Sequence, residues 1–396
     1  GPPAAEVAGG CFSSHPSDGP TSVKYTPRGI FLFWAPLAST WLMMALEGPF
    51  LAAVIARLLD AKFNLAAYGV ATAFAMLVEA PIIMLMSAST ALVEDARSYA
   101  RLRNFAYALN AFATGLLVLV LVPPVFDVIM ERLIGLPHDI ARLTYGALWF
   151  FLPWPGAIGY RRFLHGLLIR AGRTRQVAVG TVMRLLAMSG CALALAVATD
   201  LPGAWVGAAA LSTGVVVEAL ATRWMAAPRV RELLCTPASS GADDAMGYTD
   251  IARFYYPLAL TSLLGLTVQP TLTFFMGRAA LPIESLAVFP VVGGLSFLFR
   301  AFALSYQDAA IALLGRNNEH AAPVFRFAWG LALATTGALA LVTFTPAVHV
   351  WFGTISGLSP DLAALAVTPA RVLVPLPALS VLLSVLRAVM VQARRT

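Results

Sequence analysis

The sequence predicts an all-α polytopic membrane protein, and three observations support this fold class. The 396 residues are 59% hydrophobic and only 12% charged, whereas soluble domains are usually about a quarter charged. Apolar runs of about 20 or more residues recur along the chain, each long enough to cross a hydrocarbon layer of about 30 Å. The chain also resembles itself at a fixed offset. We therefore expect lipid to be the solvent of this fold.

Ten membrane-spanning helices are expected, after a polar amino-terminal tail over residues 1–29. The predicted spans are 30–58, 65–93, 104–129, 143–170, 175–199, 203–226, 251–278, 282–314, 322–350 and 363–392. Six spans fall in residues 30–226, the expected N-lobe, and four in residues 251–396, the expected C-lobe. Residues 227–250 contain Pro, Ser, Gly and Asp and are expected to form a cytoplasmic linker between the lobes. The tail lacks the apolar segment of a signal peptide.

Basic residues indicate the orientation in the membrane. They gather in loops on one side of the predicted spans, including Arg97, Arg101, Arg103, Arg170, Arg173 and Arg175. Cytoplasmic loops are enriched in Lys and Arg, so we predict a cytoplasmic amino terminus in a multi-pass protein of the inner membrane. This topology accounts for the net charge of +7 without a nucleic-acid partner.

An internal repeat relates the two halves of the chain at an offset of 221 or 222 residues. Pro36, Pro49, Arg57, Gly135, Asp139, Pro153 and Pro155 fall on Pro257, Pro270, Arg278, Gly357, Asp361, Pro375 and Pro377. An even number of spans separates equivalent positions, which predicts parallel halves related by an axis along the membrane normal. The second half ends near the equivalent of the turn after the fourth span. We therefore expect the C-lobe to be truncated relative to a plan of six plus six helices.

Two sets of residues carry a resemblance to a known group of proteins. The stretch at 166–175, Gly-Leu-Leu-Ile-Arg-Ala-Gly-Arg-Thr-Arg, resembles the glycine and arginine turn of the MATE-like multidrug, oligosaccharidyl-lipid and polysaccharide exporter superfamily. The segments at 33–37, 254–260 and 289–293 are similar to prokaryotic relatives of the progressive ankylosis protein, a branch implicated in exporting small anions. The resemblance implies a two-lobe MATE-like bundle that works as a secondary active exporter or antiporter by alternating access. It also implies a gradient of protons or sodium ions as the driving force.

Enzyme classes are disfavoured by missing motifs. The chain has no P-loop for nucleotide hydrolysis. Its histidines do not form an HExxH motif and lie far apart in the sequence, at His15, His138, His165, His320 and His349. We expect no enzymatic activity, no metal site and no cofactor. The loop at 94–101 also lacks the Gly-x-x-x-Asp-Arg pattern of the major facilitator family.

Carboxylates inside the predicted spans are candidates for ion coupling, because a charge in hydrocarbon is costly unless it is paired or faces water. The candidates are Glu47, Glu79, Glu218 and Asp308. Glu47 lies beside Gly48 and Pro49, where a kink can free a backbone carbonyl. Each carboxylate could instead be one half of a structural ion pair, so the sequence is consistent with a coupling role and with a structural role.

Basic and polar side chains are candidates for a substrate cleft. They are Arg161, Arg184, Arg300, Gln307 and Arg371. Glu79 and Arg300 are equivalent under the repeat and have opposite charges, so we predict that they pair between lobes in one access state. A permanent lobe contact would explain the same two residues. Arg162, His165 and Arg387 are near enough to a span end that we expect them to extend toward the interface.

Prolines that recur in both halves are hinge candidates, namely Pro49, Pro270, Pro153 and Pro155. The basic residues and the nearest branch favour a small organic or phosphate-bearing anion as substrate. The carboxylates keep open a cation-coupled exporter of drugs or lipid-linked saccharides. A membrane scaffold that transports nothing is the alternative of another class. The expected partners are the lipid bilayer, a small-molecule substrate and a coupling ion, with the protein acting as a monomer.

Overall fold

The computed structural model describes residues 25–171, 173–235, 247–314 and 319–392, which contain helices and turns and no strand. The first half of the chain forms α1 (Pro27–Ile55), α2 (Ala61–Glu79), α3 (Leu85–Leu92), α4 (Ala96–Val120), α5 (Pro123–Asp127), the π-helix η1 (Val128–Ile134), α6 (His138–Phe150), α7 (Trp154–Arg170), α8 (Thr174–Ala198) and α9 (Gly203–Cys235). The second half forms α10 (Tyr248–Leu266), α11 (Val268–Met276), α12 (Pro282–Leu313), α13 (Ala321–Phe344), α14 (Ala347–His349), the π-helix η3 (Val350–Ile355), α15 (Pro360–Val372) and α16 (Leu376–Gln392).

Each of the ten predicted spans coincides with a helix or with a broken helix pair. Among the described residues, eight helices are long and apolar enough to cross a membrane, or nine when the bent pair α15 and α16 counts as one span. The pair α6 and α7 is outside this set, and α7 carries three arginines, Arg161, Arg162 and Arg170. The chain is therefore a multi-pass membrane protein.

Several boundaries differ from the prediction, among them the end of α9 and the start of α1. Helix α9 continues through Pro228 to Cys235, so the first part of the predicted linker 227–250 is helical. Helix α1 begins at Pro27, where the Thr26 Oγ1 accepts a hydrogen bond from the Gly29 amide at 3.2 Å. A Ser or Thr cap of this kind satisfies an amide that has no helical partner. Residues 1–24 of the predicted tail and 236–246 of the predicted linker lie outside the described residues.

The backbone confirms the internal repeat. Gly135 ends η1 and Gly357 follows η3, with φ angles of 81° and 72°. These are the only glycines with positive φ in the described part of the chain. Glycine adopts this left-handed conformation without the steric cost that other residues meet. The same unusual ending therefore occurs at equivalent positions of both halves.

Three of the four predicted hinge prolines lie at or near breaks between helices. Pro153 and Pro155 lie where α6 gives way to α7. The equivalent pair α15 and α16 is bent by 40°. Pro270 lies near the start of α11, just after the break that separates it from α10. Pro49 lies inside the continuous helix α1. A further break at Pro81, between α2 and α3, has no counterpart in α12, which is continuous.

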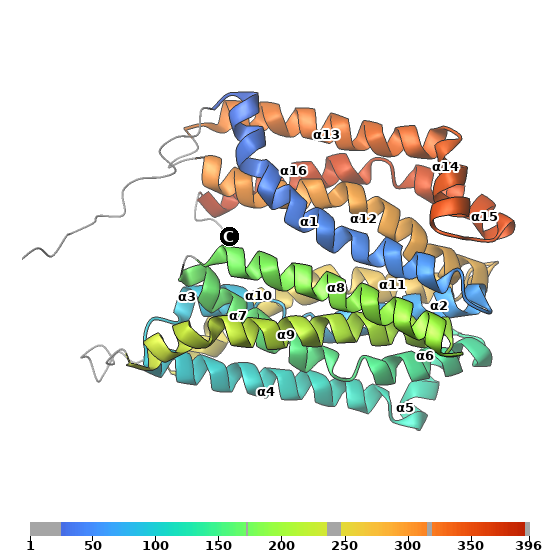
Figure 1. Ribbon diagram of the computed structural model, residues 1–396, viewed down its shortest axis with the longest axis horizontal. Helices are drawn as coiled ribbons and strands as arrows, with labels where there is room; N and C mark the ends of the chain where they lie inside the picture. Colours follow the sequence, from blue (N-terminus) through green and yellow to red (C-terminus); the bar gives the residue numbers. More distant parts are fainter. Residues whose placement is uncertain (1–24, 172, 236–246, 315–318, 393–396) are drawn as a thin grey trace, which may run out of the picture.

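The helices form two groups that α1 and α12 connect (Figure 1). Helices α13 to α16 lie in one group, and most helices of the first half lie in the other with α10 and α11. The two long helices α1 and α12 pack on each other and run obliquely from one group to the other. We call the end where α1 finishes and α12 begins the clasp end, and the opposite end the amino-terminal end.

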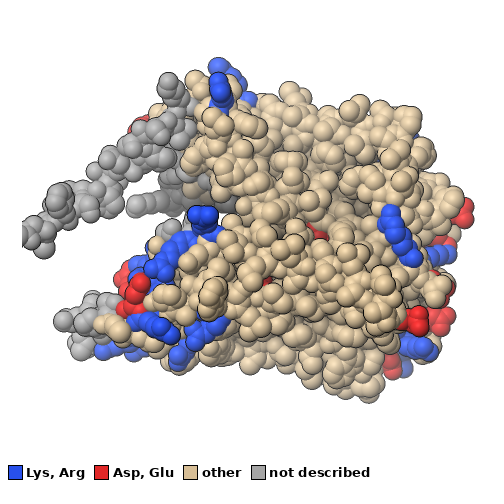
Figure 2. Space-filling view, in the orientation of Figure 1, with Lys and Arg blue, Asp and Glu red and all other residues tan. Residues whose placement is uncertain are grey.

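The apolar core shows that the two groups are joined at the clasp end. One core includes Leu51 and Leu65 of the first half with Leu286, Leu295 and Phe352 of the second. A second, separate core lies toward the amino-terminal end and joins the start of α1 to α12, α13 and α16, without helices α2 to α9. The space-filling view shows more basic than acidic side chains at the amino-terminal end, and both charge signs at the clasp end (Figure 2).

Candidate functional site

The first half of the molecule holds a buried network of charged side chains from four helices. Glu47 of α1 contacts Arg184 of α8, with 2.5 Å between Oε2 and Nη2. Arg184 also lies 3.7 Å from Glu218 of α9, measured from Nη1 to Oε2. Arg161 of α7 contacts the same Glu218 oxygen at 2.5 Å. All four side chains are at most 9% exposed, and Glu218 is fully buried. The chain of alternating charges therefore replaces the water that each ion would need.

Helical periodicity sets the next layer of the network. Arg161 and His165 lie one turn apart on α7 and face Glu218 and Thr222, which lie one turn apart on α9. The His165 Nε2 is 3.2 Å from the Thr222 Oγ1 and 3.9 Å from the Glu218 Oε1. His165 is only 4% exposed, so the prediction that it extends toward the interface is wrong. The imidazole is covered because α7 packs against α9 along this face.

Two buried carboxylate oxygens of the network have no hydrogen-bond partner among the described residues. They are the Glu47 Oε1 and the Glu218 Oε1. Buried polar atoms are normally satisfied, and exceptions often mark a place for a proton, ion or water. Carboxylate oxygens of this kind suit a proton or a hard cation. Two of the four predicted coupling carboxylates thus have an oxygen without a hydrogen-bond partner.

Glu79 occupies a separate buried position in α2. Its Oε2 accepts a hydrogen bond of 2.5 Å from the Trp154 Nε1 at the start of α7. Arg162 of α7 interacts electrostatically with Glu79, and its Nη1 lies 3.9 Å from the Met86 sulfur of α3. The Arg162 side chain is half-buried, and its Nε has no hydrogen-bond partner. Arg162 therefore lies inside the bundle, and the prediction that it extends toward the interface is wrong.

The predicted pairing of Glu79 with Arg300 is also wrong. Arg300 lies in α12, and its Nε donates a hydrogen bond of 3.0 Å to the Ser380 Oγ of α16. Glu79 is bound within the first half by Trp154. Equivalence under the repeat places the two residues at matching depths, but each faces helices of its own half.

The remaining cleft candidates lie elsewhere in the second half. Arg371 is exposed at the end of α15, where its Nε donates to the Thr343 carbonyl at 3.1 Å and its guanidinium lies 5.2 Å from the Phe344 ring centre. These contacts connect α15 to α13. Gln307 is half-buried in α12. Asp308 is in the same helix, and its side chain lies outside the described residues.

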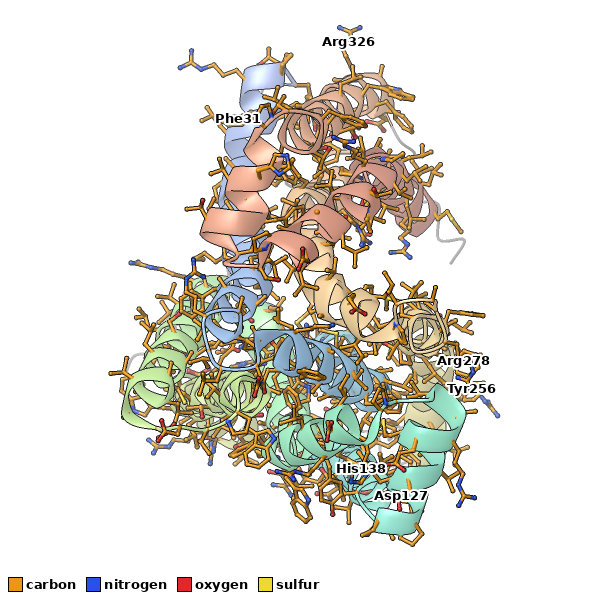
Figure 3. The ribbon with its side chains drawn as sticks, turned by 90° about the vertical axis from the view of Figure 1, so that its right-hand side faces the viewer. Phe31, Asp127, His138, Tyr256, Arg278 and Arg326 are labelled. Carbon is orange, nitrogen blue, oxygen red and sulfur yellow. The ribbon has the colours of Figure 1, made fainter. Side chains whose placement is uncertain are left out.

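An apolar groove of about 550 Å³ lies apart from the charge network, between α1 and α13. Phe31, Trp34, Phe302 and Phe327 line it, and Arg326 lies at its edge. Phe31 and Arg326 are at the upper end of the molecule in Figure 3, far from the helices that carry Glu218.

No family model and no curated protein sequence matches the chain. Its structure is similar to an inward-facing multidrug resistance MATE family transporter of the MOP superfamily, with 17% identity, a TM-score of 0.64 and coverage of 92% of this chain and 84% of that one. An outward-facing conformation of such a transporter gives 16% identity, a TM-score of 0.63 and coverage of 93% and 83%. A MOP superfamily transporter from Pyrococcus furiosus, described as having a binding pocket of reverse polarity, gives 17% identity, a TM-score of 0.59 and coverage of 93% and 87%.

Proposed function

We propose that this protein, which has the fold of MATE family transporters, is a secondary active transporter that works by alternating access. The observation that carries the proposal is the network of Glu47, Arg184, Glu218 and Arg161, buried in one half with two carboxylate oxygens unpaired. Ionisable groups inside membrane helices are costly and usually belong to ion or substrate pathways. A scaffold that transports nothing would not require the unpaired oxygens.

The coupling ion in this proposal is a proton or a sodium ion at the free oxygens of Glu47 and Glu218. Arg184 lies between the two carboxylates, so protonation or cation binding at either one changes the charge balance that Arg184 experiences. Such a change alters the packing of α1 against α8 and α9. Binding at the network therefore favours one arrangement of α1, which also contacts α12 of the second half.

The substrate in this proposal is a small organic or phosphate-bearing anion. Arg162 supports this choice, because it is a cation inside the bundle whose Nη1 contacts the Met86 thioether and whose Nε has no hydrogen-bond partner among the described residues. Arg300 adds a second cation, bound to a neutral hydroxyl. A pocket of reverse polarity is described for the related fold from Pyrococcus furiosus. A cation-coupled multidrug exporter is the second candidate, because multidrug resistance transporters share the fold.

Transport into proteoliposomes tests the function and the substrate class together. We expect the full chain to move labelled citrate or nucleotide in a saturable way when a proton or sodium gradient is applied, and we expect no saturable movement of a cationic dye. Arg162→Gln should reduce anion transport at least tenfold, because the guanidinium charge is lost. Arg97→Gln, on the exposed start of α4, is the matched control and should transport normally. Saturable dye transport without anion transport would reverse the order of the two candidates.

The placement in the membrane is part of the proposal. The amino-terminal end lies in the cytoplasm of a cell whose inner membrane holds the protein as a monomer. Basic side chains at that end support this orientation (Figure 2). With this orientation, the end where the two groups of helices have separate cores faces the cytoplasm, and the clasp end faces away from it.

A further inference from the structure

Two arginines make matching contacts between the halves at the clasp end. Arg57, just after α1, donates from Nη2 to the carbonyls of Thr354 and Ile355 at 2.8 Å and 3.0 Å. Those carbonyls end η3, in the second half. Arg278, just after α11, donates to the Ile134 carbonyl at 3.0 Å and to the Arg132 carbonyl at 3.3 Å. Those carbonyls end η1, in the first half, and Figure 3 shows Arg278 beside that segment.

The internal repeat relates most members of the two contacts. Arg57 is equivalent to Arg278 and Thr354 to Arg132, whereas Ile355 lies one position before the equivalent of Ile134. Each half thus supplies one guanidinium and one pair of acceptors. Carbonyls at the carboxyl end of a helix lack helical partners and carry partial negative charge, so they attract a cation. The arrangement resembles the interface of a twofold dimer, in which each contact occurs twice.

Glycines make the close approach feasible on both sides. A Cβ on Gly357 would lie 3.0 Å from the Arg57 Nη1. A Cβ on Gly277 would lie 2.7 Å from the Ile134 carbonyl oxygen. The Arg278 guanidinium also lies 4.2 Å from the Phe274 ring centre, which restricts its position. The arginines are therefore fixed in place rather than free at the surface.

An ion pair between the halves lies at the same end. Lys62 at the start of α2 and Glu284 at the start of α12 lie 2.5 Å from each other. Their side chains are 36% and 28% exposed. Exposed ion pairs contribute little because water and salt screen them. The arginine contacts, with four hydrogen bonds from charged donors, are the stronger connection.

We propose that Arg57, Arg278, Lys62 and Glu284 form a clasp that keeps the two halves together at this end and opens when the transporter changes access. The reason is that every hydrogen bond of the clasp joins a donor in one half to an acceptor in the other. Separation of the halves at this end breaks all of them at once, while contacts inside each half persist. The two arginine contacts are alike, so each contributes a similar share.

Distances across the clasp end test this proposal. Spin labels would be placed at Leu59 and Asp361, and in a second sample at Ala280 and Asp139, in protein whose Cys11, Cys191 and Cys235 are serine. Arg57→Gln and Arg278→Gln should each raise the ratio of long to short distances about tenfold, which corresponds to about 1.4 kcal/mol. The double variant should raise it about a hundredfold, because the two contacts are independent. Arg142→Gln, an exposed arginine of α6 at the same end, is the control and should change nothing.

Longer distances in the glutamine variants would support a clasp that opens when access changes. Lower thermal stability with unchanged distances would overturn the proposal. Arg57→Lys and Arg278→Lys replace any glutamine variant that does not fold. They retain the charge but reach fewer carbonyls, so a smaller shift is expected, and an unchanged distance would again contradict the proposal. The proposal rests on alternating access, but the readout needs no substrate. A distance shift in a protein that fails every transport assay would reject the proposed function and retain the clasp.

Discussion

The Glu47 and Arg184 side chains are bound to each other in a region with almost no water, and this determines what either residue contributes. Each ion alone would be strongly destabilising there, since the interior does not replace its hydration. Together they compensate each other, and Glu218 extends the compensation to Arg161. The network is therefore a unit in which the loss of one charge affects every other member.

We predict that Glu47→Gln and Arg184→Gln each lower the free energy of unfolding by about 3–5 kcal/mol, because the remaining partner becomes an uncompensated buried charge. The double variant should lose less than the sum of the two. Thermal and denaturant unfolding in detergent measures these changes. Glu94→Gln, which breaks an exposed pair with Arg170, is the control and should cost about 1 kcal/mol or less. Fully additive losses would show that the two side chains do not act as a pair.

The sequence identified most members of this network but not their partners. Glu47, Glu218, Arg161 and Arg184 are conspicuous because charges are rare inside apolar spans. Glu47 and Arg184 are 137 positions apart, so no local pattern could join them. Arg162 was assigned to the interface because it is only two turns from the end of α7. Its burial depends on α3, which packs across that turn and which no local signal in α7 reveals.

Helix α7 lies unusually close to α3, and the glycine and arginine turn explains how. The Gly166 carbonyl accepts a hydrogen bond of 3.2 Å from the Thr90 Oγ1, and Ser89 donates to the Phe163 carbonyl at 2.8 Å. Arg170 extends the contact, donating to the Thr90 carbonyl at 2.8 Å. The motif quoted from the sequence at 166–175 therefore acts as a docking surface between two helices.

Gly166→Ala should lower stability by about 1–3 kcal/mol, because the new Cβ would lie 1.7 Å from the Ser89 Oγ and 2.5 Å from the Met86 carbonyl oxygen. The backbone carbonyl cannot rotate away as a side chain could. Gly156→Ala in the same helix is the matched control, since no atom lies within 4 Å of its Cβ, and it should raise stability by up to about 1 kcal/mol. Thermal unfolding of both variants checks the prediction. Equal effects would contradict the close packing of α7 on α3.

The positions of the helices could be predicted from the lengths of the apolar runs, whereas the breaks inside the helices could not. The ten spans could be predicted because lipid requires long apolar helices. The break at Pro81 and the π-helices depend on contacts with other helices. The Pro81 carbonyl, for example, accepts a hydrogen bond from the Tyr255 hydroxyl of α10. The sequence predicts that Pro228 is part of a linker, but α9 continues through it.

At the scale of the whole molecule, the first span of each half packs against helices of the other half. The Trp34 Nε1 of α1 donates to the Ser305 Oγ at 2.8 Å, and its ring packs against Phe327. The equivalent residue Tyr255 of α10 packs against Phe105, which is the equivalent of Phe327. The two halves are thus interlocked by the same aromatic contact made twice.

The repeat predicted which residues correspond but not which of them touch. Glu79 and Arg300 correspond and remain apart. Lys62 corresponds to Ile283 and forms an ion pair with the next residue, Glu284. Equivalent helices meet only where they lie near the pseudo-twofold axis, as the starts of α2 and α12 do. The sequence gives the offset, but the distance from the axis requires the folded structure.

The crossing of α1 and α12 is the central contact between the halves, and Pro49 is at its centre. A Cβ on Gly294 of α12 would lie 3.2 Å from the Pro49 Cγ and Cδ, whereas a Cβ on the adjacent Gly293 would have no neighbour within 4 Å. We predict that Gly294→Val separates the two helices, lowers stability by about 1–3 kcal/mol and reduces transport severalfold.

Gly293→Val is the matched control, because it adds the same side chain to the same helix on an open face. It should leave transport nearly unchanged. Thermal unfolding in detergent and transport by proteoliposomes would be measured for both variants. Because Pro49 fills the space above Gly294, this comparison also tests its predicted role as a hinge. If the two valine substitutions have the same effect, the crossing of α1 and α12 does not restrict the motion of the halves. The hinge must then lie at the helix breaks beside Pro153 and Pro270.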